Sequence, residues 1–383
     1  MFKKDYIIMK KEALIISFSQ IRSDPRIQRQ ISILKGNYVI TVVGYGQKEE
    51  SSDYNLLSLP ASRLIKSKIK DALLLKVGMY ETFYWGRDEV KFAFEAIQDT
   101  AYDLIVANEI ESLPLALKKF PRSKIWFDAH EYSPLEFSEN FKWRFFFQKY
   151  RKYLCRKYLS QPVFSTTVCD SIAGLYLKTF KREMHVLTNS SFYCDLKPTN
   201  ISEEKIQIVH HGAAIRSRQI EVMIDLMDWL DERFLLNLIL MPNDINYIEE
   251  LRRKAVGKRV RFLPPVELGK IPTYLNQFDL GIFLLKPVNV NYEYALPNKI
   301  FEFIQARLCI VVGPSVEMVK VVKKHDLGVC STSFDPKSVA DSINKLTNKE
   351  IMHFKNRSDQ AANILSFEKE SADILDKINS HIH

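Results

Sequence analysis

Residues 294–313, YALPNKIFEFIQARLCIVVG, combine a tight turn, a short helix and a buried strand in one continuous stretch. The helix is expected to begin near Asn298, after the turn Ala295-Leu296-Pro297-Asn298, and the strand to run from Leu308 to Val312. Short apolar strands that alternate with helices are typical of a parallel sheet covered by helices. The stretch therefore predicts an α/β fold.

The same alternation extends along the rest of the chain. In the first half, the apolar runs EALIISFS, YVITVVGYG, YDLIVAN and KIWFDAHE follow one another with helical or polar segments between them, and the form restarts at KIQIVHHGAAI. A polar segment without periodicity, residues 192–205, separates the halves. We therefore predict two doubly wound domains, residues 1–195 and 196–350, followed by a helical tail over residues 351–383.

The composition is typical of a folded protein with more than one domain. The chain has 383 residues, of which 46% are hydrophobic and 26% charged. It has no apolar run of about 18 residues, the length that a membrane-spanning helix needs. The apolar part of the N-terminus, residues 13–18, precedes no small-residue cleavage site, which favours a first strand over a signal peptide.

The charged residues and the cysteines indicate the kind of partner and the cellular compartment. The net charge is +9, and residues 1–190 contain 30 Lys and Arg against 21 Asp and Glu, so the whole excess lies in the first half. This asymmetry indicates an anionic partner for one domain. The five cysteines are far apart and form no C-x-x-C, which argues against a disulfide framework or a zinc site and favours a reducing cytoplasm.

Polar pairs follow two strands of the first predicted domain. Asn108-Glu109 follow YDLIVA, and His130-Glu131 follow KIWFDA. Ligands of open α/β sheets bind at this edge, where a glutamate can serve as a general base and a histidine can donate to a sugar hydroxyl or a phosphate. Helix caps or loop salt bridges are the structural alternative for each acid. No G-x-G-x-x-G follows the first strand, so the nicotinamide fingerprint is absent.

At two helix starts in the second predicted domain, the residues favour binding of an anion. Gly212 is expected just past a strand, and Arg216 and Arg218 stand where the next helix begins. Asn298 and Lys299 open the helix of the stretch quoted first. Backbone N–H groups at a helix start, together with cationic side chains, are suited to binding phosphate.

Glu302 lies one turn further along that helix, on the same face as Asn298. A carboxylate repels phosphate but accepts hydrogen bonds from hydroxyls, such as the two of a ribose. The structural alternative is a glutamate that only complements the helix dipole. His210 and His211 have no third ligand at metal spacing, so we predict no metal site.

In the order and spacing of several segments, the chain resembles glycosyltransferases of the GT-B architecture, close to family 4 and its relatives in bacterial surface-polysaccharide synthesis. The segments are DPRIQRQISIL, VANEIESLPLAL, FDAHEYSPLEF, HVLTNS, HHGAAIRSRQIEVMI, FDLGIFLLKP and ALPNKIFEFIQARLCIVVG. The resemblance runs over nearly the whole chain and implies two Rossmann-like domains with a cleft between them. It also implies a nucleotide-sugar donor on the C-terminal domain, an acceptor on the N-terminal domain, and a C-terminal helix that crosses back to the first domain.

The resemblance assigns roles to residues that match the family's motifs. Arg218 and Lys299 would contact the diphosphate, Glu302 the ribose, and His130 the donor sugar. Catalysis in the family needs no metal and no other cofactor, because basic residues and helix dipoles stabilise the leaving diphosphate. The resemblance also implies that the configuration of the transferred sugar is retained.

The chain departs from the family's pattern of two glutamates separated by seven residues. Glu302 fits the second glutamate, but Tyr294 stands eight places earlier, where the first is expected, and Glu293 is one position off. In the family the first glutamate binds hydroxyls of the donor sugar, so this chain gives no prediction of which sugar it takes. Glu109 stands where relatives often have aspartate.

A basic and aromatic stretch, residues 141–159, is predicted to form one helix. Its aromatic and leucine side chains recur at three- and four-residue spacing from Trp143 onward. Such a helix can lie on an anionic bilayer, which would suit an acceptor carried on a polyprenyl diphosphate, or it can pack the stripe on the core. The basic residues expected on the membrane side are Lys149, Arg151, Lys152 and Arg156. No nucleic-acid-binding motif accompanies this charge.

We therefore predict a cytoplasmic hexosyltransferase, in peripheral contact with the inner face of the plasma membrane. It would move a sugar from a nucleotide diphosphate donor to a growing, lipid-linked glycan of the capsule, O-antigen or exopolysaccharide type. Its predicted catalytic residues are His130, Glu131 and Glu109. The alternatives are a nucleotide-sugar epimerase of the same architecture and a catalytically inactive GT-B subunit that scaffolds other transferases.

Overall fold

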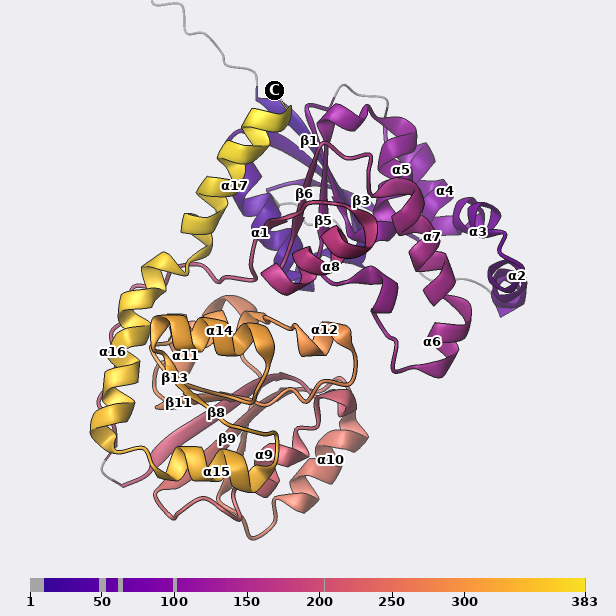
Figure 1. Cartoon of the computed structure of the whole chain (residues 1–383). Coiled ribbons are helices and arrows are strands. Elements are labelled where there is room, and N and C mark those ends of the chain that lie inside the picture. The colour runs from indigo at the N-terminus through magenta and orange to yellow at the C-terminus, as the bar shows by residue number, and fades with distance from the viewer. Residues whose placement is uncertain (1–9, 48–52, 61–64, 99–101, 203, 383) are drawn as a thin grey trace, which may run out of the picture. The chain divides into compact units, whose positions relative to one another are not determined.

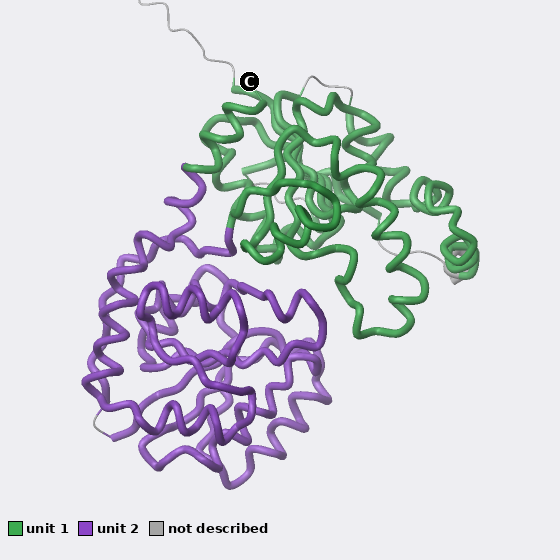
Figure 2. The backbone as a smooth tube through the Cα atoms, viewed as in Figure 1, with its two compact units in different colours: residues 1–187, 373–383 green, residues 188–372 purple. Residues whose placement is uncertain are grey.

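The computed structural model describes residues 10–47, 53–60, 65–98, 102–202 and 204–382. Figure 2 shows that the chain divides into two compact units. Unit 1 comprises residues 1–187 and 373–383, and unit 2 comprises residues 188–372. Each unit contains one parallel sheet flanked by helices, as Figure 1 shows.

Unit 1 is built on a seven-stranded sheet with the order β3-β2-β1-β4-β5-β6-β7, and all of its strand pairs are parallel. The central strands β4 and β5 are buried along their whole length, which explains their continuous apolar sequences. The strands are β1 (Lys11–Gln20), β2 (Tyr38–Tyr45), β3 (Asn55–Ser58), β4 (Leu104–Asn108), β5 (Ile125–Ala129), β6 (Phe164–Thr167) and β7 (His185–Val186).

The helices of unit 1 connect these strands. The first begins as the sequence predicts, because Asp24 accepts hydrogen bonds from the backbone of Arg26 and Ile27 and Pro25 occupies the first helical position. The helices are α1 (Pro25–Leu34), α2 (Ile65–Lys76), α3 (Tyr80–Gly86), α4 (Asp88–Ala96), α5 (Glu109–Lys119), α6 (Phe141–Phe146), α7 (Gln148–Tyr158) and α8 (Asp170–Phe180).

Unit 2 is built on a six-stranded sheet with the order β10-β9-β8-β11-β12-β13, again with parallel pairs. Its strands are β8 (Ile206–Ala213), β9 (Phe234–Met241), β10 (Val260–Leu263), β11 (Leu280–Phe283), β12 (Cys309–Val312) and β13 (Gly328–Cys330). Its helices are α9 (Glu221–Leu226), α10 (Ile245–Lys254), α11 (Ile271–Leu275), α12 (Val290–Glu293), α13 (Asn298–Gln305), α14 (Val316–His325), α15 (Pro336–Asn344), α16 (Asn348–Ile364) and the first part of α17 (Phe367–Ile382).

The strand order reverses once in each sheet. The reversal lies between β1 and β4 in unit 1 and between β8 and β11 in unit 2. Loops at the carboxyl ends of strands beside such a point are where open α/β sheets bind ligands. The predicted α/β class, with two Rossmann-like doubly wound domains, is confirmed by these two sheets.

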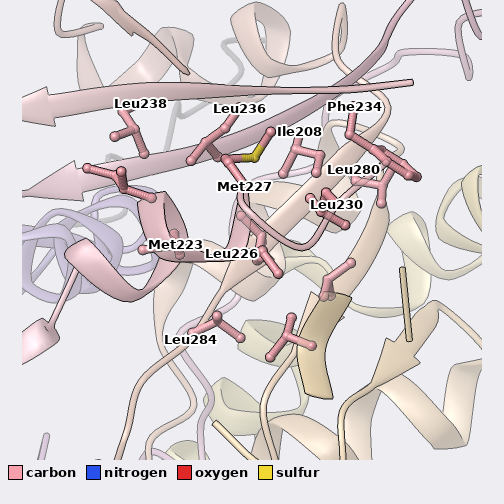
Figure 3. Packing of buried hydrophobic residues seen from close by; sticks show 14 of the residues in the cluster. Ile208, Met223, Leu226, Met227, Leu230, Phe234, Leu236, Leu238, Leu280 and Leu284 are labelled. Atoms are coloured by element: carbon pink, nitrogen blue, oxygen red, sulfur yellow. The ribbon is translucent and has the colours of Figure 1, made fainter. Parts of the chain in front are cut away.

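A buried hydrophobic cluster holds α9 against the sheet of unit 2. Figure 3 shows Ile208, Leu236 and Leu280 from three adjacent strands packing with Met223 and Leu226 of α9. All five side chains are buried. This packing fixes the end of β8, where the predicted donor-binding residues begin.

Two local predictions have specific outcomes. The strand predicted at residues 13–18 is confirmed by β1, while residues 1–9 lie outside the described part of the chain. The single helix predicted over residues 141–159 is wrong, because Phe147 separates α6 from α7. Among the described helices, none has the length and apolar character needed to cross a membrane.

Candidate functional site

The predicted donor-binding residues of unit 2 gather where β8 and β11 end and α13 begins. Lys299, in the first turn of α13, is only 8% exposed, and its Nζ lies 5.0 Å from the ring centre of Phe283. A Cβ atom added at Gly212 would lie 2.6 Å from Lys299 Nζ, and Gly212 has a φ of +129°. The backbone conformation therefore favours glycine at this position, and the end of the Lys299 side chain lies against it.

Lys299 has an unusual protonation behaviour for a lysine. Burial lowers its pKa, the charge of Arg218 lowers it further, and Glu302 counteracts them only in part, so that the pKa is about 7. The ammonium is therefore short of compensating negative charge. A phosphate group placed here would supply that charge and favour the protonated form.

Glu302 lies beside a histidine of β8. Its Oε2 lies 3.2 Å from His211 Nε2, and the His211 ring meets the Phe303 ring edge-on at 5.5 Å. Glu302 is 8% exposed and His211 6%. The carboxylate is thus largely buried beside the imidazole, one helical turn from Lys299.

His210 belongs to the packing of unit 2. Its Nδ1 lies 3.1 Å from the Ile282 carbonyl, and its ring stacks on that of Phe283 at 5.8 Å. Burial, followed by the charge of Lys299, lowers its pKa well below the usual range. The imidazole of His210 is therefore neutral and packed within unit 2.

The two predicted arginines separate. Arg218 closes the 3₁₀ turn Arg216–Arg218, and its Nη1 lies 3.4 Å from the Ala213 carbonyl at the end of β8. Arg216 instead makes a bidentate ion pair with Glu250, binds Asp244, and lies over the Tyr247 ring. The structure therefore brings Arg218, but not Arg216, to Lys299.

The remaining residues considered for the donor-binding site are Gly212, Asn298, Tyr294 and Glu293. Gly212 lies inside β8, one residue before its end, where the sequence predicted it just past the strand. Asn298 is the first residue of α13 and is partly buried. Tyr294, at the place of the family's first glutamate, follows α12 and is partly buried, whereas Glu293 is exposed.

Unit 1 contains a buried polar network at the carboxyl ends of β4 and β5. Arg26 of α1 donates from Nε and Nη2 to the two oxygens of Asp128, each at 2.7 Å. Gln30 bridges Asp128 and Asn108, also at 2.7 Å. Burial would raise the pKa of Asp128, but the charge and hydrogen bonds of Arg26 outweigh it and hold the pKa well below the usual range.

Sequence reasoning missed the members of this network other than Asn108. Neither Arg26 nor Asp128 is among the site residues predicted from the sequence. The available signal was an aspartate inside the otherwise apolar strand sequence KIWFDA, because an acid buried in a strand needs a cationic partner. The partner itself lies 102 residues away.

His130 and Glu109 meet beside this network. The backbone N–H of His130 donates to Glu109 Oε1 at 2.8 Å, and His130 Nε2 lies 3.0 Å from Asn108 Oδ1 and 3.5 Å from Asp128 Oδ2. Burial would lower the pKa of His130, but the hydrogen bond to Asp128 and the charge of Glu109 raise it above the usual value. The imidazole is therefore disposed to carry a proton.

Glu109 has two unusual properties. Its φ is +61°, a left-handed conformation that a residue with a side chain adopts at a cost, and such strain is found disproportionately at functional sites. Burial raises its pKa, and the charges of His130 and Arg151 offset this only in part. The structure brings Glu109 and His130 together, as expected for partners in one site.

These groups line a small cavity of about 160 Å³ within unit 1. Its lining residues are Ser17, Phe18, Ser19, Asp24, Asn108, Glu109, Glu111, His130, Glu136 and Arg151. Glu131 is not among them: its side chain is exposed, and its backbone carbonyl accepts a hydrogen bond from Tyr176. The cavity thus offers hydroxyls, carboxylates and an imidazole, the groups that bind sugar hydroxyls.

The predicted membrane-side residues do not share one environment. The prediction that Arg151 faces a membrane is wrong, because its side chain is largely buried and pairs with Glu111 at 3.4 Å and Glu136 at 3.2 Å. Lys149 and Arg156 are exposed and Lys152 is partly exposed. Trp143 is partly buried and lines a second cavity of unit 1.

No group of three or more His, Cys, Asp or Glu in the described residues is arranged to hold a metal ion.

Comparison with known proteins was made at the level of sequence and of structure. No family model matches the chain, and no curated protein matches its sequence. Sucrose-phosphate synthase from Thermosynechococcus elongatus is similar in structure, with a TM-score of 0.70 at 12% identity over 97% of this chain and 99% of that chain. HepE from Anabaena, in complex with UDP-glucose, gives 0.67 at 16% identity, over 96% and 99%. WaaG, a glycosyltransferase involved in lipopolysaccharide biosynthesis, gives 0.64 at 11%, over 96% and 99%.

These similar structures are GT-B glycosyltransferases, and the likeness extends over both units of the chain. Sequence identities of 11% to 16% carry no assignment of substrate. Together with the two parallel sheets, they establish that this chain has the GT-B fold of two Rossmann-like domains.

Proposed function

We propose that the protein is a glycosyltransferase that moves a hexose from a nucleotide diphosphate-sugar to a growing, lipid-linked surface glycan. The observation that carries the proposal is the presence of a buried, charge-deficient Lys299 and a largely buried Glu302 beside His211, one turn apart at the start of α13. The first group is suited to a diphosphate and the second to a pair of hydroxyls. A nucleoside diphosphate presents both at adjacent positions.

The donor would be bound by unit 2. Lys299, Arg218 and the backbone N–H groups that open α13 would hold the diphosphate, whose negative charge grows as the sugar leaves. Glu302 would accept hydrogen bonds from the ribose hydroxyls. HepE, which this chain resembles in fold, was solved with UDP-glucose, which supports a donor of this class.

The acceptor would be bound by unit 1. Glu109, His130 and Asn108 would bind its hydroxyls, and we propose that His130 also donates to the donor sugar. Protonated His130 would stabilise negative charge that develops during transfer. We further propose that transfer retains configuration, needs no metal, and takes place in the cytoplasm at the inner face of the plasma membrane.

Replacing Glu302 by glutamine tests the proposal. UDP and UDP-glucose should raise the melting temperature of the wild-type protein, because a ligand of the native state stabilises it. Glu302→Gln should bind roughly 10–100-fold more weakly, since a hydrogen bond to a charged group is worth about 1.5–3 kcal/mol. Glu249→Gln, at an exposed position of the same unit, is the matched control and should bind like the wild type.

Product analysis distinguishes transfer from the alternatives. Release of nucleoside diphosphate should depend on an added glycan acceptor. A change in the sugar without transfer would identify an epimerase instead. Absence of nucleotide binding across a panel of nucleoside diphosphates and their sugars would overturn the proposal.

A further inference from the structure

Unit 1 contains a second, larger cavity of about 580 Å³. It lies among α2, α3, α6 and α7, and its lining is mainly apolar and aromatic. The lining residues are Asp71, Ala72, Leu75, Phe83, Arg87, Glu89, Glu111, Trp143, Phe146, Phe147 and Arg151. Nothing in the proposed transfer reaction uses the apolar part of this cavity.

The apolar wall is built from aromatic rings that hold one another in place. Phe83 is buried and meets Phe147 edge-on at 6.4 Å and Tyr150 edge-on at 5.0 Å. Leu75 of α2 is buried beside them. A cavity of this size with such a wall is suited to a hydrocarbon ligand.

The polar end of the cavity is shared with the smaller cavity that holds His130 and Glu109. Glu111 and Arg151 line both. Arg87 pairs with Glu111 at 2.7 Å and with Glu89 at 2.8 Å, and with Asp71 the lining has three carboxylates against the two arginines Arg87 and Arg151. This wall therefore favours hydroxyls over phosphate. The two cavities together fit an amphipathic molecule with an apolar chain and a sugar at one end.

The helices around the cavity are apolar on their outward faces as well. Ile69 and Leu73 of α2 are 74% and 60% exposed, and Phe141 and Phe145 of α6 are 69% and 54% exposed. α2 and α6 pack beside each other. A helix that is apolar on both faces is normally buried in protein or in lipid, and these are not buried in protein.

Exposed cations surround these apolar side chains. They are Lys70, Lys142, Arg144 and Lys149. Apolar side chains flanked by lysine and arginine are characteristic of surfaces that enter the interface of an anionic bilayer. Figure 1 shows α2 and α3 standing apart from the sheet of unit 1, as such a surface requires.

We propose that the 580 Å³ cavity binds the hydrocarbon chain of the acceptor lipid, which enters from the bilayer between α2 and α6. The sugar attached to that chain then points past Glu111 and Arg151 toward Glu109 and His130. This inference rests on the proposed function and adds where the chain of the acceptor is held.

Fluorescence quenching tests the site directly. The probe is a dodecyl β-glucoside with bromine at the end of its chain, used below its micelle concentration, and the reporter is Trp143, the only one of the four tryptophans that lines the cavity. Quenching is expected in the wild type and should be lost in Trp143→Phe. Quenching that persists in Trp143→Phe would place the chain elsewhere and overturn the proposal.

Two matched substitutions on α2 separate the cavity from the outer surface. Ala72→Phe fills the cavity and should abolish quenching of Trp143, whereas Leu73→Phe adds a ring on the outward face and should leave it unchanged. Equal quenching in both variants would mean that the chain lies only on the outer surface, which contradicts the proposal.

Activity measurements keep this inference distinct from the proposed function. In Ala72→Phe the KM for a dodecyl glycoside acceptor should rise by about tenfold or more. Losing the burial of as few as two methylene groups of the chain weakens binding by about tenfold. Binding of UDP-glucose should not change. Quenching with no binding of any nucleoside diphosphate or nucleotide-sugar of the panel would overturn the proposed function but not the cavity. Nucleotide binding with no quenching would overturn the cavity alone.

Discussion

Lys299 should make the proposed nucleotide binding sensitive to pH. Burial and the charge of Arg218 lower its pKa to about 7, so at pH 8 most molecules hold it neutral. A bound diphosphate favours the charged form and raises this pKa, so binding takes up a proton. The affinity for UDP should therefore fall as the pH rises from 7 to 9, by up to about tenfold per pH unit. Calorimetric titration in buffers of different ionisation enthalpy measures both the affinity and the proton uptake.

The matched variants are Lys299→Met and Lys270→Met, the second at an exposed position of unit 2. Lys299→Met should bind UDP weakly at every pH and take up no proton at this site, because it lacks the ammonium group of Lys299. Lys270→Met should behave as the wild type. A wild-type affinity that stays constant from pH 7 to 9 would contradict the role given to Lys299.

Among individual residues, the sequence predicted those whose closeness follows from their spacing within one helix. Lys299 and Glu302 lie in one helix start, and their closeness follows from helical spacing. The sequence did not predict that Arg216 would turn to Glu250 or that Arg26 would pair with Asp128. Those pairings join positions 34 and 102 residues apart, and only the folded sheet brings them together.

Among the elements, α1 is joined to β5 by a buried ion pair, beside a hydrogen bond from Gln30 to the same aspartate. Asp128 is fully buried and Arg26 is 4% exposed. Replacing Asp128 by asparagine leaves a buried guanidinium without its charged partner, and such changes cost about 3–5 kcal/mol in the free energy of unfolding. Urea denaturation of the wild type and Asp128→Asn measures the difference.

Asp53→Asn is the control, since Asp53 pairs with Lys35 at 3.1 Å on the surface. Exposed pairs contribute about 0–1 kcal/mol, so this variant should unfold nearly like the wild type. Because Arg26 depresses the pKa of Asp128 in the folded state, its stabilisation is present above about pH 3.9 and is lost as the pH falls below that value. Equal destabilisation by the two variants would contradict the importance of burial.

The helices show where periodicity is a sufficient guide and where it is not. The stripe Tyr150, Leu154 and Tyr158 is buried in α7, as three- and four-residue spacing indicates. Arg151, beside that stripe, was expected to face a membrane. It is held inside by Glu111 and Glu136, which come from other segments of unit 1. The pattern gives the buried face of a helix but not the partners that draw a charge into it.

Across the whole molecule, the C-terminal helix α17 belongs to both units. Its first residues lie in unit 2, where Glu370 accepts hydrogen bonds from Thr188 and Ser190. Residues 373–383 cluster with unit 1, where the His381 ring lies 5.3 Å from that of Phe164. The stability of unit 1 therefore depends on the last residues of the chain, whereas the proposed donor-binding residues all lie in unit 2.

This division predicts that one core substitution near the C-terminus weakens unit 1 and leaves donor binding intact. Ile378 is 1% exposed, and truncation of a buried isoleucine to alanine costs about 2–5 kcal/mol. Ile378→Ala should lower the unfolding temperature of unit 1 in calorimetry while its affinity for UDP stays that of the wild type. Lys377→Ala, at the exposed neighbouring position, should change neither quantity. A loss of UDP affinity in Ile378→Ala would show that the two units do not act independently in donor binding, contrary to the assignment of Lys299, Arg218 and Glu302 to unit 2 alone.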